Sequence, residues 1–135
     1  MLGVNVAQQL KDAGLSWKPA LGDRFAIPDR DLDDELFVLS NMTIQIYNLP
    51  EGRVIGFNGT TEWALDDLEI EEAIWLPRED QLRSLLGGSF RSLVRESADF
   101  RVEIQIGDET LVYDGAEPSA AYAEALLALV LRGTT

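Results

Sequence analysis

Cysteine and histidine are both absent from this chain of 135 residues. Without cysteine it has no disulfide, no thiol nucleophile and no thiolate ligand for zinc. Without histidine it lacks the commonest general base, the commonest metal ligand and the side chain that usually titrates near neutral pH. A Ser-His-Asp triad is therefore excluded. Catalysis would be left to carboxylates, hydroxyls, Tyr, Arg and the two lysines, Lys11 and Lys18.

Positive charge is scarce as well. Lys and Arg together number 11 against 24 Asp and Glu, so the formal net charge is −13. A surface with this balance repels nucleic-acid phosphates and anionic lipid headgroups, because binding to either relies on clustered Lys and Arg. We therefore expect no nucleic-acid partner and no membrane partner. The charge favours instead a protein with a basic surface, or a cation.

Long apolar runs and targeting segments are missing from the sequence. The most apolar stretch, AYAEALLALVL (121–131), contains Glu124 and is shorter than the ~20 apolar residues that span a bilayer. The first 14 residues lack the basic region and apolar core of a signal peptide. Together with the absence of cysteine, these features predict a cytoplasmic protein.

Cofactor motifs are missing too. The chain has no G-x-x-x-x-G-K-[ST] phosphate loop, no G-x-G-x-x-G fingerprint and no G-x-S-x-G elbow. The adjacent glycines of LLGGSF (85–90) come without a lysine and without a preceding strand, which is typical of a helix stop. We expect no cofactor, and no residue is assigned a catalytic role.

The residues that are present predict one α+β domain over residues 1–135. Hydrophobic residues make up 46% and charged residues 26%, as in ordinary soluble domains. Apolar spacing and Pro or Gly boundaries predict helices over 4–13, 77–86 and 118–131. Period-two alternation predicts strands over 42–49, 90–97, 100–106 and 110–115, and short apolar or β-branched runs predict strands over 24–28, 36–40, 53–57 and 73–76. We expect a mostly antiparallel sheet of about five to seven strands with N-terminal, central and C-terminal helices packed on it.

The predicted C-terminal helix is apolar around most of its circumference. A helix of this kind is buried on more than one side. Two arrangements stay open: the helix lies between the sheet and another helix, or it contributes to a homodimer interface.

The stretch PDRDLDDEL (28–36) is strongly acidic. Five carboxylates lie within seven positions: Asp29, Asp31, Asp33, Asp34 and Glu35. An EF-hand calcium loop needs Gly at position 6 and Glu at position 12. Counted from Asp29, those positions hold Asp34 and Ser40, which excludes that motif. The stretch then predicts a solvated loop that can contact a cation, with a looser divalent-cation site at Asp29, Asp31 and Asp33 as the alternative.

Two other groups of residues are weaker candidates. In DDLEIEE (66–72), Glu69 and Glu72 have the spacing of magnesium-binding pyrophosphohydrolases, but a long second helix with a matching pair is missing. This segment is better interpreted as an exposed acidic connector. Trp17 and Trp63 lie beside predicted loops, where they are expected to be partly exposed and could line a small-ligand pocket, whereas Trp75 is expected in the core.

Three stretches carry a resemblance over most of the chain: LSWKPALGDRFAIPDRDLDDELFVLSNMTI, GRVIGFNGTTEWALDDLE and IWLPREDQLRSLLGG. They resemble a group of small acidic bacterial proteins, mainly actinobacterial. The looser pattern W-x-P-x-x-G-D-x-F, followed by W-L-P and a leucine-rich helix, is similar to short Gram-positive proteins, some of them phage-linked. Some relatives carry the label of a pilus-assembly ATPase, but this chain has no phosphate loop and is far too short. The resemblance implies a recurring domain without an established activity, and no functional residue carries over.

These observations together favour a non-enzymatic cytoplasmic protein-interaction domain, with a homodimer through the last helix as a further expectation. Two alternatives from other classes remain. One is a divalent-metal-dependent hydrolase that uses the clustered carboxylates of 29–35 or 66–72. The other is a small-ligand-binding module near Trp17 and Trp63.

Overall fold

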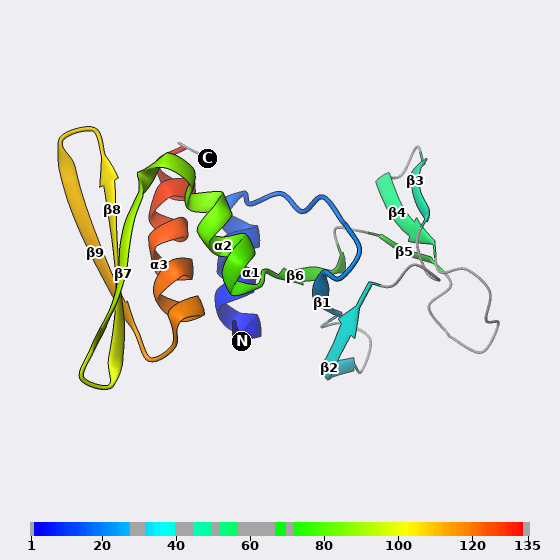
Figure 1. Ribbon diagram of the computed structural model, residues 1–135. Coiled ribbons are helices and arrows are strands. Elements are labelled where there is room, and N and C mark those ends of the chain that lie inside the picture. The colour runs from blue at the N-terminus through cyan, green and yellow to red at the C-terminus, as the bar shows by residue number, and fades with distance from the viewer. Residues whose placement is uncertain are drawn as a thin grey trace. The chain divides into compact units, whose positions relative to one another are not determined.

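The computed structural model describes part of the chain. Described are residues 2–27, 32–39, 45–49, 52–56, 67–69 and 72–133, with only the backbone described in 32–36, 45–49, 52–56 and 67–69. The elements are α1 (Val4–Ala13), β1 (Arg24–Ile27), β2 (Leu32–Val38), β3 (Gln45–Leu49), β4 (Gly52–Gly56), β5 (Asp67–Glu69), β6 (Ile74–Leu76), α2 (Glu79–Leu86), the 3₁₀ turn η2 (Gly87–Ser89), β7 (Phe90–Glu96), β8 (Asp99–Ile106), β9 (Glu109–Gly115) and α3 (Pro118–Leu131) (Figure 1).

The chain divides into two compact units. Unit 1 consists of Met1–Ser16 and Pro77–Thr135, and unit 2 is Trp17–Leu76. The expected α+β class with antiparallel pairing is confirmed. The expected single sheet of five to seven strands is not, because the described strands form three sheets with the orders β2-β1-β6, β3-β4-β5 and β7-β8-β9. The prediction of one domain over residues 1–135 stays a prediction.

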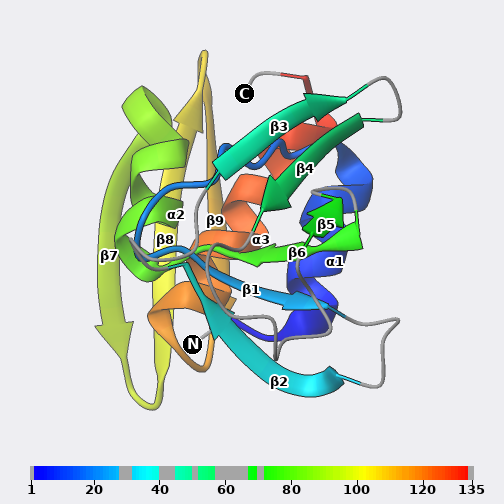
Figure 2. The same cartoon turned by 90° about the vertical axis from the view of Figure 1, so that its right-hand side faces the viewer.

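Unit 1 is a layered arrangement with α3 at its centre. One side of α3 packs on strands β8 and β9, and other sides pack on α1 and α2. Figures 1 and 2 agree that α3 stands between the β7–β8–β9 sheet and α1. Of the two arrangements left open for the apolar helix, the structure shows the first, burial within one chain.

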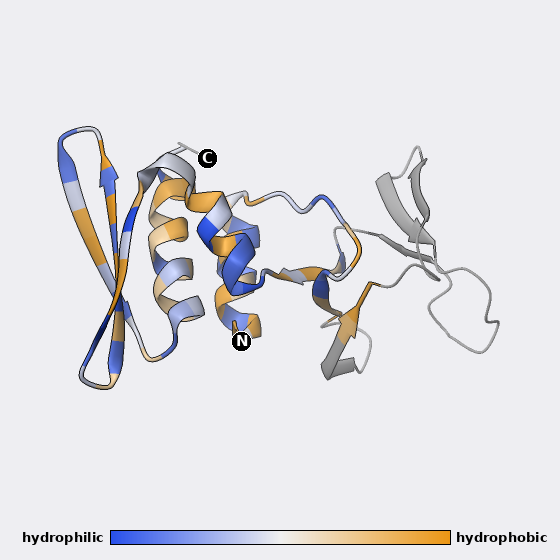
Figure 3. Ribbon diagram, viewed as in Figure 1, coloured by the Kyte–Doolittle hydropathy of each residue, from blue (hydrophilic) through white to orange (hydrophobic). Residues whose placement is uncertain are grey.

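The sequence of α3 explains this central position. Pro118 begins the helix at N1, where its missing N–H costs no hydrogen bond. Its buried residues cover most of the circumference: Ser119, Ala121, Tyr122, Ala123, Ala125, Leu126, Leu129 and Val130. Figure 3 shows the hydrophobic colouring concentrated along its C-terminal half. A homodimer through α3 stays a prediction, with Leu131 at the helix end exposed to 69%.

The β7–β8–β9 meander forms as the alternation predicts. In β8, Val102 and Ile104 are fully buried and lie on the face covered by α3, while Arg101 and Glu103 alternate with them. The strands pair antiparallel throughout, with Val102 opposite Leu93 of β7 and Tyr113 of β9. One face of the sheet is therefore core, and the other is turned away from it.

The helix boundaries follow capping chemistry. Gly14 ends α1 with φ of 115°, a left-handed conformation that favours glycine. The helix predicted to begin at residue 77 begins instead at Glu79, and Arg78 is its N-cap. The backbone N–H of Arg78 donates to Oε1 of Gln81 at 2.8 Å, and this bond fixes the start of the helix.

Unit 2 contains two three-stranded sheets. Strands β3 and β4 lie within and near the predicted strands 42–49 and 53–57 and pair antiparallel, with Leu49 opposite Gly52. In the other sheet β1 is central, paired antiparallel with β2 and β6. A compact apolar cluster is built on this second sheet: Trp17, Phe25, Ile27, Leu39 and Ala73, with Phe37 and Trp75 packed against it.

Candidate functional site

The acidic stretch lies differently from its prediction as a loop. Asp29 and Asp31 fall outside the described residues. Asp33, Asp34 and Glu35 belong to strand β2, so for these three the loop prediction is wrong. The pairing of β2 with β1 extends to Leu32, which lies opposite Ile27. The strand therefore begins before the apolar residues 36–40 from which the sequence predicts it. Binding of a cation by this stretch stays a prediction.

The second acidic segment, 66–72, is described only in part. Asp67–Glu69 forms strand β5, paired with β4, and Glu72 is exposed just before β6. Nowhere in the described ranges do three or more Asp or Glu side chains gather in a way that could hold a metal ion. None of the described helices combines the length and the apolar character that a membrane crossing requires.

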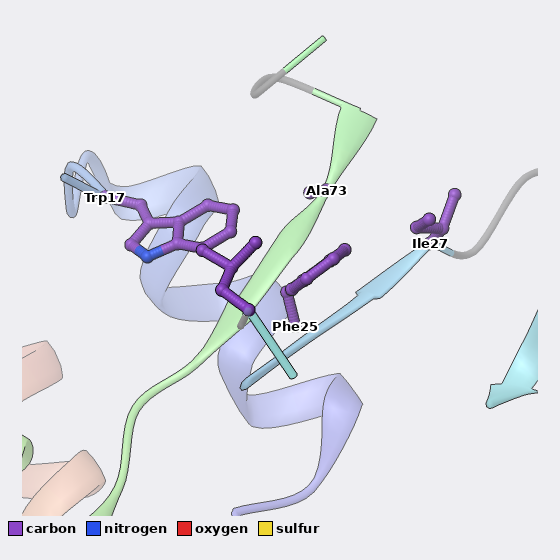
Figure 4. Close-up of a cluster of buried hydrophobic side chains, with 5 residues drawn as sticks. Trp17, Phe25, Ile27 and Ala73 are labelled. Atoms are coloured by element: carbon purple, nitrogen blue, oxygen red, sulfur yellow. The ribbon is translucent and has the colours of Figure 1, made fainter. Parts of the chain in front are cut away.

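Trp17 does not lie at the partly exposed position that the sequence predicted for it. Trp17 is 6% exposed and belongs to the core of unit 2, so the expectation of partial exposure is wrong. Its ring lies 5.5 Å from that of Phe25 and stacks at 6.5 Å on Trp75, and Figure 4 shows Trp17 and Phe25 within one cluster. Trp63 lies outside the described residues.

A buried carboxylate explains why Trp17 is held inside. Asp23 is 2% exposed, and its Oδ2 accepts hydrogen bonds from the indole Nε1 of Trp17 at 2.9 Å and from the backbone N–H of Ala20 at 3.0 Å. The backbone of Asp23 makes a further hydrogen bond, in which the Leu39 N–H donates to the Asp23 carbonyl at 2.9 Å. The W-x-P-x-x-G-D-x-F pattern therefore supplies the hydrogen bonds of Asp23 that hold Trp17 in the core, and we call this arrangement of Trp17, Ala20 and Asp23 the lock. Gly22, directly before the aspartate, has a positive φ.

The face of the β7–β8–β9 sheet that points away from α3 is a candidate contact surface, which we call the outer face. By strand register and ion pairing it carries Val94, Glu96, Arg101, Glu103, Val112 and Asp114. Among the described residues of unit 1, no helix lies against this face (Figure 1).

Two valines interrupt the polar character of the outer face. Val94 is exposed to 45% and Val112 to 47%. Polar residues are expected at solvated positions of an antiparallel sheet. Val94 lies opposite Arg101, and Val112 lies opposite Glu103, so each valine borders a charged side chain. Apolar side chains surrounded by charged ones are the arrangement found in protein–protein contacts.

The charges of the outer face are unevenly paired. Arg101 makes ion pairs with Asp114 (Nε to Oδ1, 2.9 Å) and with Glu96 (Nη1 to Oε2, 3.1 Å). Glu103 on the central strand makes no ion pair within the part of the chain that the structure describes. Three carboxylates against one guanidinium leave the face net negative.

Replacement of Arg101 by Gln is expected to raise the pKa of Asp114. The hydrogen bond from Arg101 holds the pKa of the Asp114 carboxyl below its ordinary value. A lowered pKa in the folded state means that the interaction stabilises the fold above the unfolded pKa and is lost as pH falls through the folded pKa. Carboxyl-detected NMR titration of both proteins checks this, and an unchanged Asp114 pKa in Arg101→Gln would contradict the pairing.

Sequence reasoning missed both the outer face and a pocket on helix α2 near Tyr122. The alternation along β8 predicts which residues share a face of the sheet. It does not predict which of the two faces a helix covers, because that depends on tertiary packing. Tyr122 was one residue among many in the apolar helix, and its neighbours Glu79 and Arg83 come from a distant segment.

No protein-family model matches this chain, and no curated protein or solved structure is similar enough to it to count as a match.

Proposed function

We propose that this protein is a non-enzymatic interaction domain that contacts another protein through the outer face of the β7–β8–β9 sheet. The observation that carries the proposal is the exposure of Val94 and Val112 on a sheet face that none of the described helices of unit 1 covers. Burying two half-exposed valines removes apolar surface from water, which favours association.

The charge of the outer face indicates the chemistry of the partner. Its carboxylates outnumber its single guanidinium, and the whole chain carries a net charge of −13. A partner with a basic surface is attracted at long range, and its Lys or Arg side chains would pair with Glu103. Since such attraction is screened by salt, the association rate falls as ionic strength rises.

The size of the outer face indicates a transient complex. Strands of about seven residues rise roughly 3.3 Å per residue and lie about 4.8 Å apart, so the face covers on the order of 300 Å². A stable specific interface buries about 800 Å² on each partner. The complex is therefore expected to be weak and salt-sensitive. A tight complex would require a contact surface that extends beyond the three strands.

Photo-crosslinking in cells tests the proposal. A benzophenone amino acid replaces Val94 or Val112 in the full chain, and matched variants carry it at Glu124 or Leu131, which are exposed on α3. A covalent adduct with the same protein is expected from both sheet positions and from neither helix position. Charge reversal by Glu103→Lys is expected to lower the adduct yield several-fold. Equal adducts from positions 112 and 124, or none from 94 and 112, would refute the proposal.

A further inference from the structure

The β7–β8–β9 sheet has two edges, formed by β7 on one side and by β9 on the other. The backbone N–H and C=O groups along the outer side of an edge strand can pair with a further strand. Proteins block such pairing with irregular backbone and with positively charged side chains on the edge. In the described part of unit 1, the two edges differ in both respects.

The β7 edge is closed to a further strand. Its register with β8 is irregular between Phe90 and Ser92. The Arg91 side chain between them folds back on the start of the strand, where its Nη1 donates to the carbonyls of Gly88 at 2.7 Å and Phe90 at 3.1 Å. Arg95 adds a second positive charge to the strand. A segment that approached this edge would meet an irregular backbone with two carbonyls already bonded.

The β9 edge is regular and acidic. Its seven residues, Glu109 to Gly115, pair with β8 without a shift in register. Among the described strands, none pairs with the other side of β9. The segment 107–117, which contains β9 and its flanks, has no Lys, Arg or Pro. It carries four carboxylates: Asp108, Glu109, Asp114 and Glu117.

Three residues of β9 turn their backbone groups to the free edge. The two-residue turn 107–108 precedes the strand, and Glu109 lies opposite the last residue of β8. Such a turn closes with its flanking residues as a hydrogen-bonded pair, and bonded and non-bonded pairs then alternate along the ladder. Counted from this turn, the residues that do not bond to β8 are Thr110, Val112 and Asp114. Their side chains are exposed and share the outer face.

We propose that the partner of the outer face supplies an extended segment with Lys or Arg, which adds as a fourth strand along the free edge of β9. The inference rests on the proposed function and names the part of the partner that binds. The carboxylates of 107–117 attract positive side chains, and the net charge of −13 opposes a second copy of this chain as the added strand. Main-chain hydrogen bonds supply affinity, and side chains beside Val112 and Asp114 supply specificity.

Amide NMR of the full chain with a defined peptide tests this inference. The probe is a seven-residue peptide of alternating lysine and valine with blocked ends. At saturation it is expected to shift the amides of Thr110, Val112 and Asp114 and to slow their hydrogen exchange, because each gains a hydrogen bond. The amides of Leu111 and Tyr113 point to β8 and serve as internal controls. Absence of saturable binding, or binding that leaves the three edge amides unchanged, would overturn the inference.

Two matched peptides separate strand addition from simple charge attraction. Methylation of every backbone nitrogen keeps the side chains but removes the N–H donors, and it is expected to weaken binding about 10-fold or more. Replacement of the lysines by glutamates keeps the alternation and reverses the charge, with a loss of about 10-fold or more expected. Equal binding of the methylated peptide would overturn strand addition and leave a contact through the outer face standing. Equal binding of the glutamate peptide would overturn the basic character of the segment.

Substitutions at Thr110 test the same contact from the protein side. Thr110→Pro removes one N–H from the free edge and no donor to β8, so it is expected to weaken peptide binding about 5-fold or more. Thr110→Val keeps the N–H and the branched side chain and should leave affinity unchanged. Equal affinity of the two variants would overturn the inference, and the methylated peptide decides if Thr110→Pro does not fold. A chain that dimerises without peptide, with the same edge amides protected, would make a second copy the occupant and would also overturn it.

Discussion

Replacement of Asp23 by Ala is expected to lower the free energy of unfolding by about 3 kcal/mol or more. The substitution leaves the buried indole N–H of Trp17 and the part-buried backbone N–H of Ala20 without their common acceptor. A buried donor without a partner costs about 1–3 kcal/mol. Urea unfolding followed by tryptophan fluorescence measures the loss.

Three comparison variants separate this lock from a general effect of charge. Asp23→Asn keeps one acceptor oxygen, so it should cost less than Asp23→Ala. Trp17→Phe removes the donor, and in the double variant the two losses should not add, because one hydrogen bond is shared. Glu124→Ala removes a carboxylate from an exposed helical position and should change stability by no more than about 0.5 kcal/mol. An Asp23→Ala loss as small as that of Glu124→Ala would contradict the lock.

Replacement of Gly115 by Ala is expected to cost about 3 kcal/mol. Gly115 ends strand β9 where the chain passes close to the first turn of α3. A Cβ at this position would lie 2.6 Å from the backbone nitrogen of Ala121 and 2.9 Å from the Cβ of Ala120. Because a backbone atom blocks the space, α3 must shift from its place between the sheet and the other helices. Overpacking of this kind typically costs about 1–3 kcal/mol and occasionally more.

Gly88→Ala is the matched control for this substitution. An added Cβ at Gly88 would meet nothing within 4 Å, and the residue is exposed. Its substitution should therefore change the urea midpoint little, within about 0.5 kcal/mol. Equal losses in the two glycine variants would show that glycine content, and not the close approach to Ala121, sets the stability of unit 1.

Much of unit 1 could be predicted from sequence because its signals are local. Gly14 and Pro118 mark helix ends through backbone geometry, and the alternation from Phe100 to Ile106 marks a half-buried strand. These patterns act within a few residues of the chain. These patterns predict the individual helices and strands, but they do not predict how the strands group into sheets.

The errors arose where tertiary packing overrides a local signal. Asp33, Asp34 and Glu35 have charges typical of a loop, yet they belong to strand β2, which pairs with β1 at Leu32 before them and at Phe37 and Val38 after them. Trp17 follows a helix end and precedes Pro19, but the buried carboxylate of Asp23 draws its indole into the core. Neither outcome depends on the residues next in sequence.

The candidate surfaces were out of reach of sequence reasoning for the same reason. The outer face is defined by which side of the meander α3 covers, and the free edge of β9 is defined by which strands pair with each other. The net charge of −13 agrees in sign with the outer face, where three carboxylates face one guanidinium.

The methyl spectrum of the valine-labelled chain, recorded with and without the crosslinked partner, tests the proposed contact most directly. Val94 and Val112 lie on the outer face, and Val102 lies on the inner face of the same sheet as an internal control. The account predicts that the methyl resonances of Val94 and Val112 shift or broaden at low salt and recover at high salt, while Val102 changes little. Perturbation of Val102 alone, or unchanged resonances of Val94 and Val112 in the saturated complex, would contradict it.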